Sequence, residues 1–568
     1  MKGKFKNIYV LLLYLFFTLI LTYPAIFRFS THFMCDEGDG FQNVWNLWWL
    51  KTALLELRAN PYYTNYLHHP DGVTLLFHTL NPFNGLISIP LQYLFSMEVV
   101  YNLIVMFSFV MSGFFMYLLS RYLTNCKPAA FVSGVIFTFS PYHFGHGLGH
   151  LQLIAMEWIP FYVLYLLRAF YEGGKKEAIL AGVFLILITL CSWYYLIYSL
   201  FFTAIFVIYQ VFVDKRKVRI ENLWLTGLVF FAVLSPLIGA MIYAKLSQQF
   251  LGAHNPVVWS ADLLSFFVPG GILTFGKPFE SIWSKFSGNI AENSNYIGYI
   301  VLFFAIYGFL KGKKPRVAAF RKAEEARFFL IAGGLFFLLS LGPYLRVLGK
   351  VTKLPLPYLF FHNFIPFFSF TGVPGRFDIM VVFCLAILVS YAIERICANL
   401  SSFKKLAFTG VVSVFIMLEY LAIPYTTTQI HVPEFYKKLR EDKEEYAIID
   451  IPSRPVTLYF QTIHRKRLIG GYVSRPSKKA IDFLSNTPVI NELMLNPKAA
   501  KEAKGSGREP LSKQSLQGKK QVAKHIFEQY NIRYVITHTD DKREFIEETL
   551  KLPCVYDAEG IRAYATTF

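Results

Sequence analysis

Residues 8–26 read "IYVLLLYLFFTLILTYPAI", and this run decides the class of fold. It is apolar over about 20 residues, the length that an α-helix needs to cross a bilayer. Basic residues precede it, as in a signal peptide, but its apolar core is too long and no small-residue cleavage site follows it cleanly. We therefore interpret it as a retained membrane anchor.

Comparable runs recur along the chain, which is 54% hydrophobic and has a mean hydropathy of +0.41. They predict an α-helical polytopic membrane protein with about eleven transmembrane helices, within a transmembrane domain that covers residues 1–427. The expected spans are residues 8–27, 99–123, 129–145, 151–171, 177–193, 195–213, 222–244, 296–310, 326–342, 377–397 and 404–424.

The net charge of +19 indicates topology, and we expect no nucleic-acid partner. Lys and Arg concentrate in short connections on one side, such as "DKRKVR" (214–219) and "KGKKPRVAAFRK" (311–322). This is the positive-inside pattern, which places the N-terminus in the cytoplasm. A multi-pass protein of the plasma or inner membrane follows, with a first extracytoplasmic loop at 28–98 and further outer regions at 245–295 and 343–376.

The tail, residues 428–568, has a different composition. Strand-like runs such as "EYAIIDIPS" (445–453) and "IRYVITHTDD" (532–541) alternate with helical patterns such as "KKQVAKHIFEQY" (519–530). With an odd number of spans the tail lies outside the cytoplasm, so we expect a small soluble extracytoplasmic α/β domain. The six Cys residues are scattered and contain no CxxC pair, so they imply no disulfide framework.

Three carboxylates follow the first apolar run at once, in "CDEGDG" (35–40). Asp36, Glu37 and Asp39 lie beside Gly38 and Gly40, which allow a tight turn. The next residues, "FQNVWNLWWLKTALLELRAN" (41–60), predict an amphipathic helix in the membrane interface, which would hold the turn near the headgroups. Such carboxylates can act as a general base, and Asp36 and Asp39 can bind a divalent cation, Mg²⁺ or Mn²⁺. A solvated loop is the simpler alternative.

Arg376 is a candidate for binding substrate phosphate. It follows a Pro-Gly pair in "FTGVPGRFDIM" (370–380), where an outer loop leads into an expected helix. A guanidinium at a helix start suits a phosphate group. A plain interfacial anchor is the alternative.

Histidines on the expected outer face are further candidates for substrate contacts. His143, His146 and His150 lie in "SPYHFGHGLGHLQL" (140–153), and His78 closes "HHPDGVTLLFH" (68–78). The first three could also bind a metal or be ordinary loop residues. Glu157 follows inside an apolar run, where a carboxylate indicates either a cavity or a polar partner across the bundle.

The whole pattern resembles the GT-C class of integral-membrane glycosyltransferases, with "DEGD" (36–39) as the only motif at the level of residues. In that class a first span leads into an outer loop that carries an Asp, many spans follow, and a soluble domain often ends the chain. The resemblance implies transfer of a sugar, of hexosyltransferase type, from a polyprenyl-phosphate-linked donor to a lipid, glycan or protein of the cell envelope. It assigns catalysis to Asp36, with Glu37 beside it and Asp39 as the competing base.

Two other classes of function compete with this one. A lipid or polysaccharide transporter would use intramembrane polar residues as a pathway. A non-catalytic cell-envelope assembly protein would not need Asp36. The sequence has neither a Walker A pattern nor a GxGxxG between a strand and a helix, so for an enzyme the energy of transfer comes with the lipid-linked donor and no cofactor beyond a cation is implied.

Overall fold

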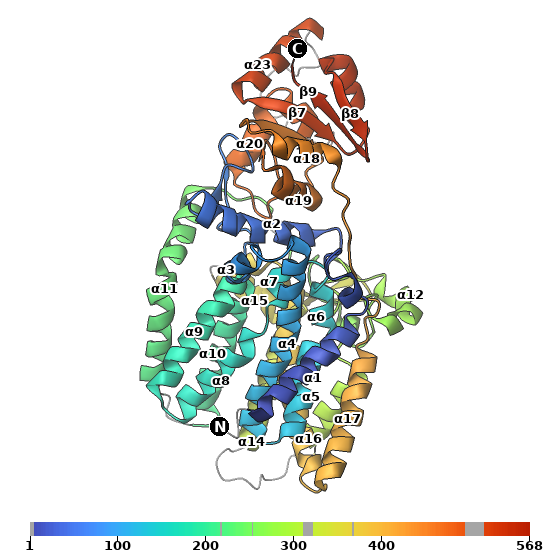
Figure 1. Ribbon diagram of the computed structural model, residues 1–568. Helices are drawn as coiled ribbons and strands as arrows, with labels where there is room; N and C mark the ends of the chain where they lie inside the picture. Colours follow the sequence, from blue (N-terminus) through green and yellow to red (C-terminus); the bar gives the residue numbers. More distant parts are fainter. Residues whose placement is uncertain are drawn as a thin grey trace. The chain divides into compact units, whose positions relative to one another are not determined.

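The computed structural model describes residues 5–215, 219–252, 254–310, 322–365, 368–494 and 516–567. The chain divides into two compact units, which Figure 1 shows as a ribbon. The helical unit comprises Met1–Cys35, Leu94–Ser235 and Ala253–Thr427. The composite unit comprises Asp36–Tyr93, Pro236–Gly252 and Thr428–Phe568. The first outer loop, which the sequence places with the transmembrane domain, therefore shares a unit with the tail.

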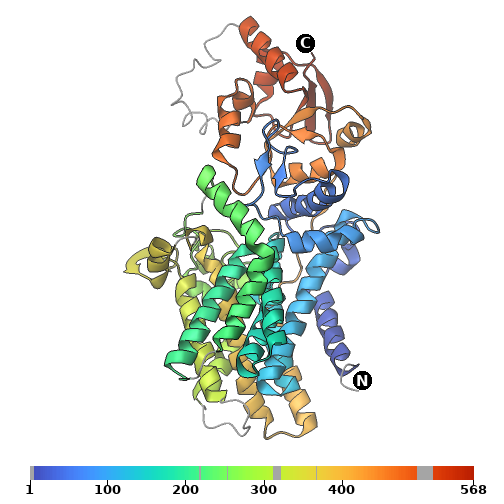
Figure 2. The same ribbon diagram turned by 90° about the vertical axis from the view of Figure 1, so that its left-hand side faces the viewer.

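The helical unit is a bundle in which long helices run side by side (Figures 1 and 2). Its helices are α1 (Phe5–Leu21), α4 (Met97–Thr124), α5 (Lys127–Thr138), α6 (Pro141–His146), α7 (Leu151–Ile154), α8 (Trp158–Tyr171), α9 (Lys175–Cys191), α10 (Trp193–Phe212), α12 (Glu280–Trp283), α13 (Tyr299–Leu310), α14 (Lys322–Ser340), α15 (Pro357–Phe364), α16 (Asp378–Cys397) and α17 (Ser402–Glu419). Helix α11 (Ile220–Ser247) begins in this unit and passes the unit boundary at Pro236. A hairpin of β3 (Tyr344–Val347) and β4 (Lys350–Pro355) and short 3₁₀ turns complete it, among them η6 (Pro374–Phe377).

Each of the eleven expected spans contains a helix. Within the described residues, five helical segments are long and apolar enough to cross a membrane: Met97–Thr124, Leu151–Tyr171, Trp193–Phe212, Ile220–Ser247 and Pro374–Cys397. Two shorter apolar helices are Asn7–Leu21 and Tyr299–Gly308. The protein is therefore a multi-pass membrane protein by helix length and composition, and the count of eleven spans stays a prediction.

Two expected spans are interrupted. The run at 129–145 ends as α5 at Thr138, and α6 restarts at Pro141. Ser140 caps α6, because its hydroxyl accepts a hydrogen bond from the His143 amide at 3.4 Å, and proline is well tolerated in the first turn of a helix. The run at 151–171 breaks between α7 and α8, so Glu157 lies at the start of α8 and not in mid-helix.

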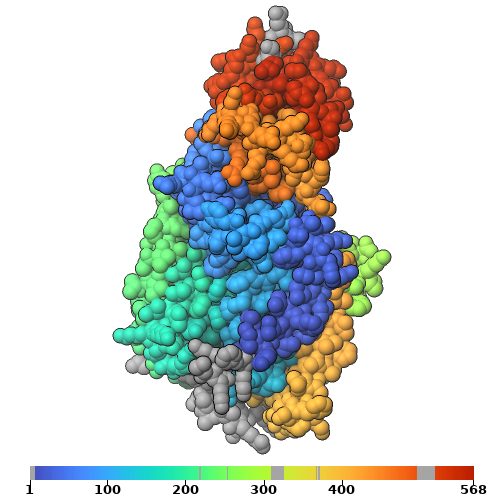
Figure 3. Space-filling model, viewed as in Figure 1, coloured from blue at the N-terminus to red at the C-terminus, as the bar shows by residue number. Residues whose placement is uncertain are grey.

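The composite unit joins the first outer loop to the tail. The loop contributes α2 (Asp39–Lys51), a π-helical turn η2 (Thr52–Glu56), β1 (Tyr63–Thr64), β2 (Val73–Thr74) and α3 (Pro82–Leu91). The tail contributes α18 (Glu434–Glu441), β5 (Ala447–Ile451), α19 (Pro455–His464), β6 (Arg467–Leu468), α20 (Lys478–Asn486), α21 (Ile490–Met494), α23 (Leu516–Gln529), β7 (Ile532–Thr537), a π-helical turn η9 (Phe545–Leu550), β8 (Cys554–Ala558) and β9 (Ile561–Ala565). Figure 3 shows the blue side chains of the loop against the orange ones of the tail.

One mixed sheet organises the tail, in the order β6-β5-β7-β9-β8. Strand β5 is parallel to both β6 and β7, whereas β9 is antiparallel to β7 and β8. All five residues of β5 are buried, as expected for a central parallel strand. Helices α20, α21 and α23 supply apolar residues to the same core, including Leu484, Ile490 and Phe527.

Helix α2 is buried on all sides. It begins after Gly38, and Asp39 in its first turn and Lys51 in its last turn both suit the helix dipole. Every residue from Gly40 to Leu50 is buried. Trp45 donates a hydrogen bond from Nε1 to Oε1 of Gln461 on α19 at 2.7 Å. The prediction of a helix with one face in the membrane interface is therefore wrong for these residues, because protein covers their aromatic side chains.

Candidate functional site

The acidic turn lies at the start of α2, in the composite unit. One carboxylate oxygen of Asp36 accepts a hydrogen bond from the Gly38 amide at 2.8 Å, which closes the turn. Asp39 accepts a hydrogen bond from the Tyr472 hydroxyl at 3.2 Å. Burial, together with the Asp39 charge, raises the pKa of Tyr472 to about 12, so this hydroxyl stays protonated and can donate. Asp36 and Asp39 are half-buried and Glu37 is exposed.

His78 contacts both α2, which follows the turn, and the segment around Ser474. Its Nδ1 accepts from the Ser474 amide at 3.3 Å, and its Nε2 lies 3.0 Å from the side-chain oxygen Oδ1 of Asn46, which fits a neutral ring protonated on Nε2. Gln42 bridges the same ring and the Ser474 hydroxyl, at 3.2 Å and 2.9 Å. Burial lowers the pKa of His78 to about 4, although the Asp39 charge acts to raise it. His78 is thus a positioning residue that fixes α2 to the segment around Ser474.

In chemical terms the turn offers two half-buried carboxylates. Asp36 and Asp39 are three positions apart, and each keeps part of its surface accessible. A half-buried carboxylate beside a protonated tyrosine hydroxyl can accept a proton from an acceptor hydroxyl or contribute to a cation site. Such a role requires that substrate can reach the carboxylates. Glu37, which lies between them in the sequence, is itself exposed.

Arg376 lies in the helical unit, in the turn η6 that leads into α16. It is only 7% exposed, and it forms an ion pair with the equally buried Glu292, with hydrogen bonds from Nε at 2.9 Å and from a terminal nitrogen at 2.5 Å to Oε1. Its guanidinium also lies 4.8 Å from the centre of the Tyr194 ring. Glu292 lies in the outer region 245–295 and belongs to no motif of the sequence.

His146 and His150 meet Glu292 in the same unit. Their Nδ1 atoms are 3.1 Å apart, and one ligand atom from each of the three residues lies within 4.8 Å of the others. In the part of the chain that the structure describes, no other group of three or more His, Cys, Asp or Glu side chains meets this spacing. Burial lowers the pKa of His146 well below its usual value. Burial acts to raise the pKa of Glu292, but the Arg376 guanidinium and the neighbouring imidazoles together outweigh it and lower that pKa to about 2.

His143 and Glu157 form a separate polar cluster in the helical unit. The His143 ring is fully buried, stacks on Phe109 at 3.9 Å and lies 2.7 Å through Nδ1 from the Thr138 carbonyl oxygen. Ser108 lies 3.4 Å from the other ring nitrogen and donates to Glu157 at 3.1 Å. These contacts connect α4 to the breaks that begin α6 and α8. The geometry therefore separates His143 from His146 and His150.

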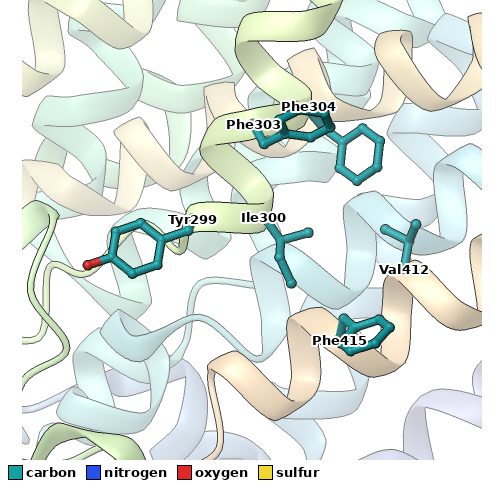
Figure 4. Close-up of a pocket in the computed structure, with 6 residues that line it drawn as sticks. All are labelled: Tyr299, Ile300, Phe303, Phe304, Val412 and Phe415. Carbon is teal, nitrogen blue, oxygen red and sulfur yellow. The ribbon is translucent and has the colours of Figure 1, made fainter.

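An apolar groove lies between α13 and α17 in the helical unit. It has a volume of about 450 Å³, and Figure 4 shows the six residues that line it: Tyr299, Ile300, Phe303, Phe304, Val412 and Phe415. At its edge, Glu419 accepts hydrogen bonds from the amides of Tyr299 and Ile300 at 2.6 and 3.2 Å, which closes the N-terminus of α13. The groove is open and almost wholly apolar, as expected of a surface that faces lipid.

Sequence reasoning missed two residues of these arrangements, Glu292 and Tyr472. Glu292 sits in a loop without periodicity, 84 positions from its partner Arg376. Tyr472 lies 433 positions from Asp39, in a tail that the sequence treats as a separate domain. The only local signal for Glu292 is a carboxylate within the polar run "ENSN" (292–295).

Comparison with known proteins places the chain by family and by fold. The model of a family described as "Domain of unknown function (DUF6311)" matches residues 10–421. No curated protein matches the sequence. Among solved structures, the mycobacterial arabinofuranosyltransferase AftD is similar with a TM-score of 0.57 at 14% identity, over 98% of this chain and 40% of that chain. A mutant of the same enzyme gives a TM-score of 0.53 at 13% identity, over 94% and 36%.

A third solved structure is the oligosaccharyltransferase AglB from Archaeoglobus fulgidus, in complex with an inhibitory peptide and a dolichol-phosphate. Its TM-score is 0.48 at 15% identity, over 100% of this chain and 74% of that chain. The chain spans about two fifths of the length of AftD. At these identities the likeness to AftD shows the fold, and it supports the GT-C-like membrane fold expected from the sequence.

Proposed function

We propose that this chain, which belongs to the family described as "Domain of unknown function (DUF6311)", is an integral-membrane glycosyltransferase. The observation that carries the proposal is the match of nearly the whole chain to the fold of a membrane glycosyltransferase, with an acidic turn directly after the first apolar helix. Fold alone does not imply function, so the proposal depends on the turn as much as on the fold.

The donor in this proposal is a sugar linked to polyprenyl phosphate. The bundle offers apolar helices that suit the lipid tail, and the chain has no sequence motif for a soluble nucleotide donor. The acceptor is a lipid, glycan or protein of the cell envelope, outside the cytoplasm. The enzyme would be of hexosyltransferase type, in the plasma or inner membrane, with its N-terminus in the cytoplasm and the tail outside.

The reaction would be a displacement at the anomeric carbon of the donor sugar. Asp36 takes the proton of the acceptor hydroxyl as the new bond forms between the acceptor oxygen and the anomeric carbon. The bond from that carbon to the phosphate oxygen breaks, and its electron pair leaves with the lipid phosphate. Asp39, oriented by the Tyr472 hydroxyl, is the alternative base or the ligand of a divalent cation, Mg²⁺ or Mn²⁺, which would stabilise the phosphate leaving group.

Residues of the helical unit have supporting roles in this proposal. The Arg376 charge is compensated by Glu292, so its part in binding the lipid phosphate would depend on the group that it forms with Glu292, His146 and His150. His143 and Glu157 would shape the interior of the bundle, since their polar atoms face Ser108. His78 would act through α2 by fixing the acidic turn.

The experiment compares Asp36→Asn and Asp39→Asn with Asp71→Asn, an exposed carboxylate of the same outer loop. Each variant is reconstituted in proteoliposomes that contain a radiolabelled polyprenyl-phosphate hexose and an extract of envelope acceptors. We expect the Asp36 variant to lose about 10²–10⁴ in rate, the usual contribution of a positioned acid–base group, and the Asp71 variant to keep its activity.

The pair of variants separates the two candidate bases. Loss in Asp39→Asn alone would keep the mechanism and move the base by three positions. Full activity in both variants, with wild-type folding, would remove the catalytic role of the turn.

A further inference from the structure

Two histidines of one short segment and a glutamate from a distant loop of the helical unit lie close together. His146 ends α6, His150 precedes α7, and Glu292 comes from the loop before α13. Their ligand atoms lie within 4.8 Å of one another, and His146 and Glu292 are 1% and 4% exposed. His150 is half-buried and lies only four positions from His146, whereas Glu292 is more than 140 positions away and is brought to the histidine pair by the fold, which is typical of a built site and not of a chance surface cluster.

The imidazole rings of His146 and His150 approach each other through their Nδ1 atoms. Their Nδ1 atoms are 3.1 Å apart, so only one of the two can carry a proton when they contact directly. When neither carries one, both lone pairs point into the shared space. Tyr142 packs edge-on against the His146 ring, with ring centres 4.3 Å apart, and helps to hold it in this orientation.

The Glu292 carboxylate completes the arrangement. Both Arg376 hydrogen bonds go to Oε1. The other oxygen, Oε2, is buried and accepts no hydrogen bond within the described residues. A buried carboxylate oxygen without a partner is unfavourable, and a bound cation would satisfy it. Arg376 then acts as the outer partner that orients the ligand, as hydrogen-bonded groups behind metal ligands commonly do.

We propose that His146, His150 and Glu292 bind a divalent transition-metal ion, with Zn²⁺ as the best match. Two imidazole nitrogens and one carboxylate oxygen are a common set of three protein ligands for zinc, with a fourth position open to water or substrate. Mg²⁺ and Ca²⁺ prefer oxygen ligands alone, so a site with two imidazoles selects against them. The site is distinct from the cation expected at Asp36 and Asp39, which lie in the composite unit.

The inference goes beyond sugar transfer, and metal content can be measured without any substrate. If the protein binds the ion but transfers no sugar, this inference stands and the proposed function is refuted. If it transfers sugar but binds no ion, the proposed function stands and this inference is refuted. The protein is purified in detergent with a tag that contains no histidine, stripped with EDTA, and titrated with Zn²⁺ against a chromophoric chelator, with the metal content determined by mass spectrometry.

The variants are His150→Ala and Glu292→Gln, with His254→Ala as the matched control. His254 is an exposed histidine of the same unit that lies outside the group. We expect one equivalent of Zn²⁺ in the wild type and the control, and a loss in affinity of at least about 10–100-fold in the two ligand variants, since even outer-shell changes have that effect.

A spectroscopic measurement on the wild type covers the case in which a ligand variant fails to fold. Co²⁺ loaded into the stripped wild-type protein should show the visible d–d absorption of a protein-bound site, and one equivalent of Zn²⁺, which binds such ligands more tightly than Co²⁺, should remove it. The inference is overturned if the wild type binds no Zn²⁺, or if correctly folded His150→Ala and Glu292→Gln bind it as tightly as the wild type. Stabilisation by inorganic phosphate without any metal binding would assign the cluster to anions and also overturn it.

Discussion

Gln461→Leu should loosen the first outer loop although the substitution lies in the tail. Gln461 is fully buried on α19. Its Oε1 accepts from Trp45, and its Nε2 donates to the carbonyl oxygens of Tyr66 and Lys466 at 2.7 and 3.0 Å. Leucine keeps a similar volume but removes all three hydrogen bonds.

The expected loss in stability follows from the groups left behind. The Tyr66 carbonyl keeps a hydrogen bond from the Leu468 amide at 2.8 Å, so the main losses are at Trp45 Nε1 and the Lys466 carbonyl. A buried polar group left without a partner costs about 1–3 kcal/mol, which gives a loss of about 3 kcal/mol here. For a unit of this size that is a fall in Tm of about 6–12 °C.

The assay combines thermal unfolding in detergent with hydrogen exchange. We expect the amides of α2 to exchange faster in Gln461→Leu, together with those of β5 and β7, because loop and tail share one unit. Gln529→Leu is the control, since Gln529 is exposed on α23. Unchanged protection of α2, or a Tm equal to that of the control, would refute the claim that the loop and the tail fold as one unit.

Three further predictions concern topology, pH and the backbone. Cys554 is exposed in the tail, so a membrane-impermeant maleimide should label it in intact cells; labelling only after permeabilisation would place the tail in the cytoplasm. His78 has a folded pKa of about 4 against a usual value of 6.5, so its contribution to stability is complete above about pH 6.5 and is lost as the pH falls toward 4; unfolding by urea should show this fall, and His78→Gln should reduce it. Gly72→Ala should lower the Tm, because Gly72 has a φ of +69° and a Cβ there would lie 2.5 Å from the Thr64 carbonyl oxygen; an unchanged Tm would contradict this conformation of the β1–β2 hairpin.

The sequence predicts the helices of the bundle well because hydropathy acts locally. An apolar run near 20 residues is helical in a bilayer whatever its neighbours are, and so α4 and α16 were found within a few residues. The breaks at Ser140 and at residues 155–157 were missed, since a cap and a few irregular residues leave the mean hydropathy of a run unchanged. The burial of α2 was missed for another reason: the partner that covers it, α19, is more than 400 positions away.

The sequence indicates many of the residues of the candidate site, but it does not indicate which of them contact one another. The residue types and their order gave the acidic turn, Arg376 and the histidines. Which of these meet depends on contacts over long separations, so nothing local distinguishes His146 from His143, although the two belong to different clusters. Glu292 carries no pattern of its own, and only the fold connects it to Arg376.

The hydrogen bond between Tyr472 and Asp39 has a consequence for biosynthesis. The two residues are 433 positions apart, so a ribosome needs about 20–90 s after making Asp39 to deliver Tyr472. During that interval the nascent chain presents its carboxylates without the hydroxyl that orients Asp39, and α2 lacks the cover of α19. A polypeptide arrested before Tyr472 would insert its early helices and still lack a completed acidic turn. The order of synthesis thus delays assembly of the turn until about the first third of the tail has been made.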